Sequence, residues 1–342
     1  MARRSDQAGG GVSAGGPDRK CAYLGPRGTF CEQAVLALHQ AGDFEPVAYP
    51  TIGSAIDAVR TNLAERAVVP IESSVEGGVN ATLDELSAGT PLLIRAEVLV
   101  PVEFALLVRP GTTFADIKVV GGHPVAQPQC RRWLAEHLPD AQWRSALSNA
   151  DAAWRVADGE FDAALAGSFA AGHYRLAVLA SGAADRAGAV TRFVELAAPG
   201  PLPAPTAGDR TSVIAYLADD HPGALMDILS QFAVRGVNLS RIESRPTGEG
   251  IGRYCFFIDC EGHIARPSVG EALMGLRRTC SDVRFLGSYA TAPRPTAVAA
   301  AASLGRHDAG SDDKFVAAAA WLDEIRSGRG LLLEVGAGGA LL

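Results

Sequence analysis

The segment AVTRFVEL (189–196) places a hydroxyl and a guanidinium side by side in an apolar run. Its β-branched and aromatic residues predict a strand. The Arg192 guanidinium can bind a carboxylate through two parallel hydrogen bonds, and the Thr191 hydroxyl can donate or accept one. Because neighbours on a strand point to opposite faces, either the backbone bends here or one of the two has a supporting role. Phe193 points to the same side as Thr191. Its side chain either lines a ligand site or packs in the core.

A second group of candidates follows the predicted buried strand AVVPI (67–71). Ligands of α/β sheets bind beyond the carboxyl ends of the strands. Serines here can donate to ligand oxygens, and Gly77 and Gly78 let the backbone come close. An ordinary loop with helix-capping serines is the alternative. The candidates of this segment are Glu72, Ser73, Ser74 and Glu76.

The turn GPRGT (25–29) follows a predicted strand and precedes a predicted helix. Backbone N–H groups at such a helix start favour an anion, as does the Thr29 hydroxyl, and Gly28 lies in the same turn. A plain strand–helix turn is the alternative. Cys31 follows, and because no basic partner is assignable, packing or weak hydrogen bonding is favoured over a nucleophilic role.

Ser148 and Asn149 precede a predicted helix at 150–157. They are suited to cap this helix and to offer donors to a ligand, and the two roles are equally supported. His123 stands before a proline at the end of a predicted strand, where a structural role is favoured.

The elements that must position these residues alternate between short strands and helices, which predicts a parallel α/β sheet. Two strand-like runs at 91–111 join two such α/β lobes, and a cleft between lobes of this kind binds small molecules. The predicted strands are 21–25, 47–49, 67–71, 118–122, 162–167 and 189–196, and the predicted helices are 32–41, 54–62, 125–138, 150–157 and 168–174.

A proline- and glycine-rich linker is predicted at 199–209. Beyond it, at 210–291, the order strand–helix–strand–strand–helix–strand predicts a ferredoxin-like βαββαβ domain. Gly223 opens the first helix of this domain and permits close approach of a ligand or a neighbouring chain. Residues 292–342 form an extension with one amphipathic helix predicted near 314–326.

Composition excludes several classes of protein. A chain of 342 residues with 48% hydrophobic content predicts two domains. The net charge of −7 and the lack of a basic stripe argue against nucleic acid. Six cysteines without zinc-site spacing indicate reduced thiols in the cytoplasm and no metal site. No apolar run approaches the roughly 18 residues of a membrane span, and residues 1–20 read as a flexible tail, not a secretion signal.

Several motifs, in order, resemble those of prephenate dehydratases: YLGPRGTFCEQA, VVPIESSVEGGVNATLDEL, GGHPVAQPQC, SNADAAWRVADG and AVTRF. HPGALMDILSQFAVRGVNLSRIESRPTG and FFIDCEGHI resemble an ACT regulatory domain of the phenylalanine-binding type. The resemblance covers residues 21–291. The chain departs from the family at Cys31 (usually Ser or Thr), Ser73 (usually Asn), Pro128 (usually Leu) and Ala189, where an Asn commonly precedes the Thr-Arg-Phe motif.

The resemblance implies a catalytic domain at 21–198 with the two-lobed fold of type 2 periplasmic binding proteins, its lobes roughly 21–98 with 183–198, and 99–182. It implies loss of carbon dioxide and the ring hydroxyl from prephenate to give phenylpyruvate. Aromatisation drives this reaction, so no cofactor is expected. Thr191 matches the family's essential threonine. The implied substrate-binding residues are Gly28, Thr29, Cys31, Ser73, Ser74, Glu76, Ser148, Asn149, Arg192 and Phe193.

The ACT resemblance implies L-phenylalanine as effector and, because ACT domains usually pair, a homodimer or homotetramer. Three alternatives remain: a prephenate decarboxylase-like enzyme, an arogenate-using homologue, and a non-catalytic sensor of small molecules. The implied effector-binding residues are Gly223, Ala224, Leu225, Asn238, Leu239, Ser240, Glu243, Ser244, Arg245 and Pro246.

Overall fold

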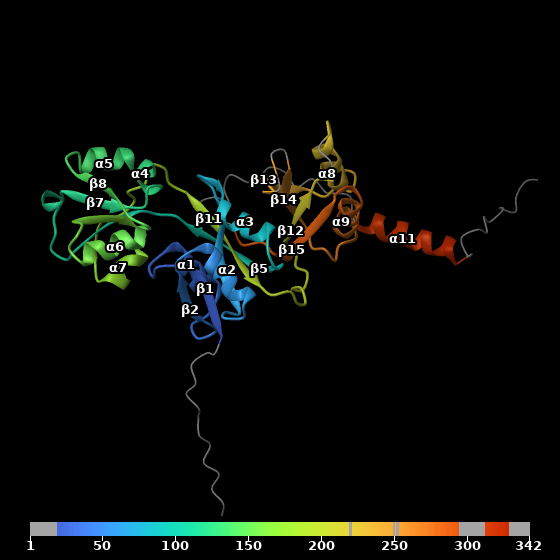
Figure 1. Cartoon of the computed structure of the whole chain (residues 1–342), viewed down its shortest axis with the longest axis horizontal. Coiled ribbons are helices and arrows are strands. Elements are labelled where there is room, and N and C mark those ends of the chain that lie inside the picture. The colour runs from blue at the N-terminus through green and yellow to red at the C-terminus, as the bar shows by residue number, and fades with distance from the viewer. Residues whose placement is uncertain (1–18, 219–220, 249, 251–252, 294–311, 328–342) are drawn as a thin grey trace, which may run out of the picture. The chain divides into compact units, whose positions relative to one another are not determined.

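A computed structural model describes residues 19–218, 221–248, 250, 253–293 and 312–327 (Figure 1). The chain forms two compact units, the first from residues 1–69 and 102–187 and the second from residues 70–101 and 188–342. Most of the predicted N-terminal tail lies outside the described residues, and so does most of the predicted C-terminal extension. No helix in the described part of the chain is both long and apolar enough to span a membrane.

A parallel set of strands begins the first unit. β1 (Lys20–Leu24) pairs with β2 (Glu45–Tyr49) on one side and with the first half of β3 (Arg66–Ser73) on the other. Helices α1 (Phe30–Leu38) and α2 (Ile52–Arg60) pack against β1. The two helices were predicted to begin two residues later and to end two or three residues later, close to the usual uncertainty at helix ends.

A second sheet in the first unit has the strand order β10-β6-β9-β7-β8. β7 runs parallel to β8 and β9, whereas β6 runs antiparallel to β9 and β10. Side chains of β6 alternate between two cores, with Leu106 and Val108 in one and Ala105 and Leu107 in the other. The strands are β6 (Ala105–Val108), β7 (Val119–Gly122), β8 (Gln142–Ser145), β9 (Ala163–Ala166) and β10 (Ala177–Ala180), and the helices are η1 (Phe114–Asp116), α4 (Ala126–Gln129), α5 (Arg131–His137), α6 (Asn149–Ala157) and α7 (Phe169–Tyr174).

The helix predicted over 125–138 is two helices, α4 and α5. The backbone leaves the helical region at Cys130, with φ −120° and ψ 15°. The carboxylate of Asp185 accepts hydrogen bonds from the N–H groups of Arg132 and Trp133 at 3.0 Å and so caps the start of α5. The cap of α5 therefore comes from a side chain far along the chain. The edge strand β8 was not predicted, because its residues are polar and mostly exposed.

The central strand of the second unit is β11 (Val190–Ala197). It lies between the end of β3 and the antiparallel strand β5 (Leu93–Pro101). β4 (Gly77–Gly78) folds back onto the end of β3 and leads into α3 (Asn80–Ser87). Only Thr82, Leu83 and Leu86 of α3 are buried, which explains why this short helix was not predicted.

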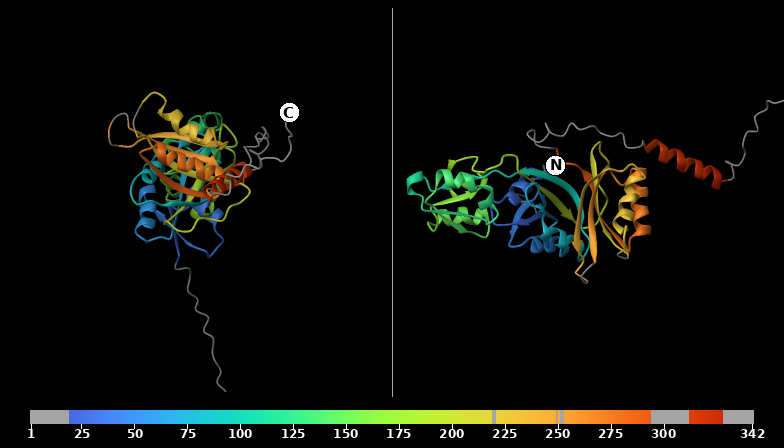
Figure 2. Two further views of the ribbon diagram at one scale, coloured as in Figure 1. Left: turned by 90° about the vertical axis from the view of Figure 1, so that its right-hand side faces the viewer. Right: turned by 90° about the horizontal axis from the view of Figure 1, so that it is seen from above.

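The C-terminal sheet of the second unit is antiparallel, in the order β13-β14-β12-β15. α8 (Ala224–Ala233) and α9 (Pro267–Thr279) lie side by side on one face (Figure 2), and their apolar side chains form one core with those of the sheet. This confirms the predicted ferredoxin-like domain beside mixed α/β layers. The strands are β12 (Asp209–Tyr216), β13 (Leu239–Pro246), β14 (Tyr254–Glu261) and β15 (Asp282–Ala290).

Two connecting parts complete the second unit. Residues 198–208 form no helix or strand, and Thr206 bonds the Asp209 carboxylate through its N–H and its hydroxyl, both at 2.7 Å. α11 (Asp312–Arg326) forms close to the range predicted. The carboxylate of Asp312 accepts from Arg266 Nε at 2.7 Å and from Ser268 Oγ at 2.8 Å, which attaches the start of α11 to α9.

Candidate active site

Thr191 lies near the start of β11, opposite Val100 of β5. Its side chain is half-buried, and its hydroxyl bonds to no other group in the described part of the chain. The backbone beside it is held firmly. Ser74 N–H donates to Val190 O at 2.9 Å, and Val190 N–H donates to Ser74 Oγ at 2.9 Å. The site thus has a hydroxyl with free hydrogen-bonding capacity on a fixed stretch of strand.

The candidates that follow β3 lie in a turn next to β11. The oxygen of Ser73 accepts from Val75 N–H at 3.2 Å, and that of Ser74 accepts from Val190 N–H. Each hydroxyl therefore still has its own proton to donate. Glu76 is exposed in the same turn. The fold therefore brings the 73–76 segment and Thr191 together, although they are far apart in the sequence.

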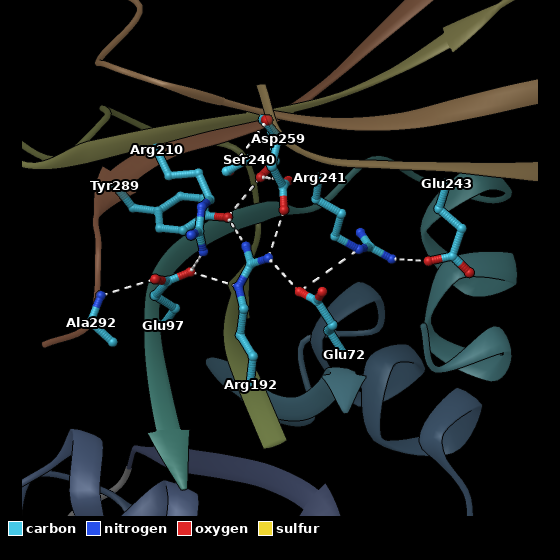
Figure 3. Close-up of polar contacts among 11 residues, drawn as sticks. Glu72, Glu97, Arg192, Arg210, Ser240, Arg241, Glu243, Asp259, Tyr289 and Ala292 are labelled. Carbon is cyan, nitrogen blue, oxygen red and sulfur yellow. Dashed lines mark hydrogen bonds and ion pairs between the residues drawn. The ribbon is translucent and has the colours of Figure 1, made fainter. Parts of the chain in front are cut away.

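Arg192 points to the opposite side of β11 from Thr191, as strand alternation requires. Its side chain is only 6% exposed. Nε donates to Glu97 at 2.7 Å, Nη1 to Asp259 at 2.6 Å, and Nη2 to the hydroxyl of Tyr289 at 2.8 Å (Figure 3). Of the two alternatives left open by the sequence, this arrangement favours the supporting role for Arg192. Phe193 is also buried, which favours core packing.

The carboxylates around Arg192 form an extended cluster. Glu97 also accepts from the Arg210 guanidinium and from Ala292 N–H, and Asp259 accepts from the Ser212 hydroxyl. Burial opposes the charge on both partners. Even so, the carboxylates raise the pKa of the Arg192 guanidinium, and Arg192 lowers the pKa of the Asp259 carboxyl. Arg192 and Asp259 are therefore both charged at neutral pH.

Most members of this cluster were not predicted from the sequence, although a signal was present. Glu97 interrupts the apolar run LIRAEVLVP, and Asp259 interrupts YCFFIDCE. A carboxylate inside a strand of this kind is rarely buried without a partner. Nothing local to the sequence pairs these two carboxylates with Arg192, which lies on another strand.

The GPRGT candidates lie in the first unit and are largely committed to local contacts. Thr29 Oγ1 caps α1 by accepting from Glu32 N–H at 3.4 Å, and it donates to Leu24 O at 3.2 Å. Gly28 N–H donates to the buried Glu32 carboxylate at 2.6 Å. Cys31 is buried, which raises the pKa of its thiol to about 12. A neutral thiol of this kind fits a packing role.

The Ser148 and Asn149 candidates also lie in the first unit, at the start of α6. Ser148 Oγ accepts from Asp151 N–H at 2.9 Å, so the predicted cap is present. Asn149 Oδ1 accepts from His123 N–H at 2.8 Å and ties the helix to the end of β7. In the described part of the chain, no three His, Cys, Asp or Glu side chains are grouped so as to hold a metal ion.

The effector candidates lie in the second unit, at the start of α8 and along β13. Gly223 has φ +99°, a left-handed conformation that favours glycine, and Leu225 beside it is exposed. Side chains of β13 alternate, with Ser240 and Ser244 exposed and Glu243 and Arg245 half-buried on the opposite face. The other candidates here are Ala224, which is buried, Asn238, whose carbonyl accepts from Glu261 N–H, Leu239, which packs against the core, and Pro246, which pairs with Tyr254.

Comparisons with known families divide the chain in the same way as its motifs. Residues 21–200 match the family described as prephenate dehydratase, and residues 211–278 match the ACT domain. A prephenate dehydratase of Mycobacterium marinum is 45% identical over 318 residues, which cover 91% of this chain and 96% of that protein.

Two solved structures are similar over most of the chain. The prephenate dehydratase of Arthrobacter aurescens in complex with L-Phe aligns with a TM-score of 0.82 at 44% identity, covering 90% of this chain and 100% of that one. GqqA, described as a novel type of quorum quenching acylase, aligns with a TM-score of 0.73 at 29% identity, covering 80% of this chain and 99% of that one. With more than half its length matched by one family and a relative this similar over nearly its full length, the chain belongs to the prephenate dehydratase family.

Proposed function

We propose that Thr191 acts on the leaving hydroxyl when this chain, a carbon–oxygen lyase, converts prephenate into phenylpyruvate. The observation that carries the proposal is the hydroxyl of Thr191, which bonds to no other described group while the backbone around it is fixed. A threonine hydroxyl is a poor acid, so its contribution comes from position rather than from proton affinity. Loss of the ring carboxylate as carbon dioxide supplies the electrons that aromatise the ring as the hydroxyl leaves.

Prephenate has two carboxylates, so the site requires several hydrogen-bond donors. In the second unit we propose the hydroxyl protons of Ser73 and Ser74, with Glu76 in the same turn. Arg192 and Phe193 are buried. We propose that Arg192 supports Thr191 from the opposite side of β11 and that Phe193 supports it by packing in the core. In the first unit the proposed substrate contacts are Gly28, Thr29, Ser148 and Asn149. For Cys31, which is buried, we propose that it supports this segment by packing.

The test of the catalytic proposal replaces Thr191 with alanine and, separately, with serine. We expect Thr191→Ala to lower kcat by about 10²–10⁴-fold, the usual contribution of a positioned proton donor, without changing the unfolding midpoint. Thr191→Ser keeps the hydroxyl and should retain part of the rate. Turnover of Thr191→Ala at the wild-type rate would show that the hydroxyl has no catalytic role.

Product identification separates this reaction from its alternatives. A decarboxylase-like enzyme releases carbon dioxide but leaves the ring hydroxyl in place, whereas an arogenate-using enzyme leaves the amino group in its product. A sensor binds prephenate and releases nothing. Because a protein of similar fold is described as an acylase, the same preparation is also assayed for amide hydrolysis. We expect phenylpyruvate and carbon dioxide in equal amounts from prephenate.

For regulation, we propose that L-phenylalanine binds the ACT domain and lowers turnover in a cytoplasmic homodimer or homotetramer. Two observations support this: the ACT match, and the related A. aurescens structure in complex with L-Phe. The proposed contacts are the α8 start and the β13 residues named above. Initial rates across micromolar to millimolar phenylalanine, with tyrosine as the comparison, and sedimentation with and without phenylalanine are the measurements. Unchanged rates throughout would remove the regulatory claim.

A further inference from the structure

Arg192 fixes the strand that carries Thr191 to the C-terminal sheet. Two of its three short hydrogen bonds go to Asp259 of β14 and Tyr289 of β15, and the third goes to Glu97 of β5. Because Arg192 follows Thr191 directly on β11, a shift of the sheet that moves this guanidinium also moves the Thr191 backbone.

Glu72 is the loosest member of the cluster (Figure 3). Its carboxylate lies 3.4 Å from Arg192 Nη1 and 3.8 Å from Arg241 Nε, compared with 2.6–2.8 Å for the other Arg192 partners. Its side chain is 38% exposed, whereas those of Arg192 and Arg241 are 6% and 7% exposed. Glu72 is therefore shared by two buried cations and is held tightly by neither.

The position of Glu72 in the chain links it to the candidate site. It pairs with Gly78 across β3 and β4, and it directly precedes the serines, of which Ser74 holds Val190 by two hydrogen bonds. A change at Glu72 therefore reaches Thr191 by two routes, through Arg192 and through Ser74 and Val190.

β13 contacts the 72–84 segment at three successive positions of one face. Arg241 reaches Glu72, Glu243 lies against Gly78 so closely that a Cβ there would overlap its carboxylate, and Arg245 donates to both oxygens of Asp84 at 2.7 and 2.9 Å. Arg241 also pairs with Glu243, so the first two contacts are joined. The opposite, exposed side of the strand carries Ser240 and Ser244.

We propose that Glu72, shared between Arg192 and Arg241, is a positioning residue through which β13 of the C-terminal domain sets the geometry of Thr191. A ligand that moves β13 from its exposed side changes how Glu72 divides its contacts between the two arginines. This proposal rests on the proposed role of Thr191. The contacts from β13 through Glu72 to β11 would be the connection by which a ligand regulates this site.

The test compares Glu72→Gln, Arg241→Gln and the double variant with the wild-type protein. Glu72→Gln keeps the side-chain shape and removes its charge. We expect each single variant to lower kcat by roughly 2- to 30-fold, the range of measured couplings, with little change in KM. We expect the double variant to lower kcat no further than the stronger single variant, because both changes break one connection. Effects that multiply in the double variant would overturn the proposal.

A matched control is Asp282→Asn, which removes a carboxylate from the same sheet. Its ion pair with Arg277 at 3.2 Å is exposed and lies outside the cluster, so turnover should stay at the wild-type level. If Glu72→Gln behaved like Asp282→Asn in kcat, Glu72 would have no positioning role.

Amide hydrogen exchange separates failure of this proposal from failure of the proposed function. Ser74 N–H and Val190 N–H bond each other's residues, so their exchange reports the fixed backbone beside Thr191. We expect both amides to exchange faster in Glu72→Gln and to be unchanged in Asp282→Asn. This holds even if wild-type protein does not turn over prephenate. Equal exchange in all three proteins would overturn the connection whatever the activity.

Discussion

Replacement of Arg192 by methionine tests how the buried cluster stabilises the second unit. Methionine has a similar length but no charge, so Asp259 and Glu97 would stay buried with fewer partners. Removing one member of a buried ion pair destabilises a protein by about 3–5 kcal/mol. In the variant Glu97 keeps its bonds from Arg210 and the Ala292 N–H, and Asp259 keeps its bond from Ser212. We therefore expect a loss of unfolding free energy at the lower end of this range, about 3 kcal/mol. This is a large share of the roughly 5–15 kcal/mol that stabilise a typical domain.

The sign of the pH dependence follows from Asp259. Burial acts to raise its pKa, but Arg192 and other arginines lower it below the ordinary value. Its stabilisation is therefore complete above the unfolded pKa of about 3.9 and is lost as the pH falls through the folded pKa. Without Arg192 the folded pKa of Asp259 rises. The loss of unfolding free energy in Arg192→Met is then complete above that raised pKa, and it becomes smaller as the pH falls through it.

The assay is urea unfolding followed by circular dichroism from pH 8 down to about pH 4, the range that brackets the expected shift. Arg192→Met/Asp259→Asn should recover part of the lost stability because the buried charge is gone. Arg277→Met removes an arginine from an exposed ion pair and should change stability by less than about 1 kcal/mol. If Arg192→Met were as stable as wild type at pH 7, or if its loss of stability did not depend on pH, the buried cluster would not stabilise the second unit in this way.

Two further outcomes follow from the first unit. Gly28 has φ +81°, and a Cβ there would lie 3.2 Å from Tyr174 Cε2 and 3.3 Å from Ala170, so Gly28→Ala should lower the unfolding free energy by about 1–3 kcal/mol. Gly172→Ala in α7 has open space and should be neutral or stabilising by up to about 1 kcal/mol; equal losses in both variants would contradict the strain argument. Because burial raises the pKa of the Cys31 thiol to about 12, native protein should resist iodoacetamide at this residue at pH 8 and react only when unfolded. Rapid labelling of Cys31 in native protein would contradict its burial.

Local pattern in the sequence was enough for most elements of the fold, but not for α3 and β8, whose side chains are mostly outside the core. The strand runs and amphipathic helices predicted the α/β layers, and the β-α-β-β-α-β order predicted the C-terminal domain, because both depend on periodicity within single elements. Prediction also failed where a distant group takes part. The segment 125–138 forms two helices, and the carboxylate that caps the second belongs to Asp185, a contact that nothing within the segment indicates.

For the candidate site, too, the sequence predicted part of the arrangement and the tertiary structure decided the rest. The motifs made Thr191 and the serines after β3 candidates. Strand alternation left two alternatives for Thr191 and Arg192, a bend in the backbone or a supporting role for one of them. Which side each faces, and which groups meet the guanidinium, was decided only by the tertiary structure. Glu97 and Asp259 lie 95 and 67 residues from Arg192 along the chain. The free energy of burying a charge depends on partners that such distant strands bring together, and local periodicity carries no information about them.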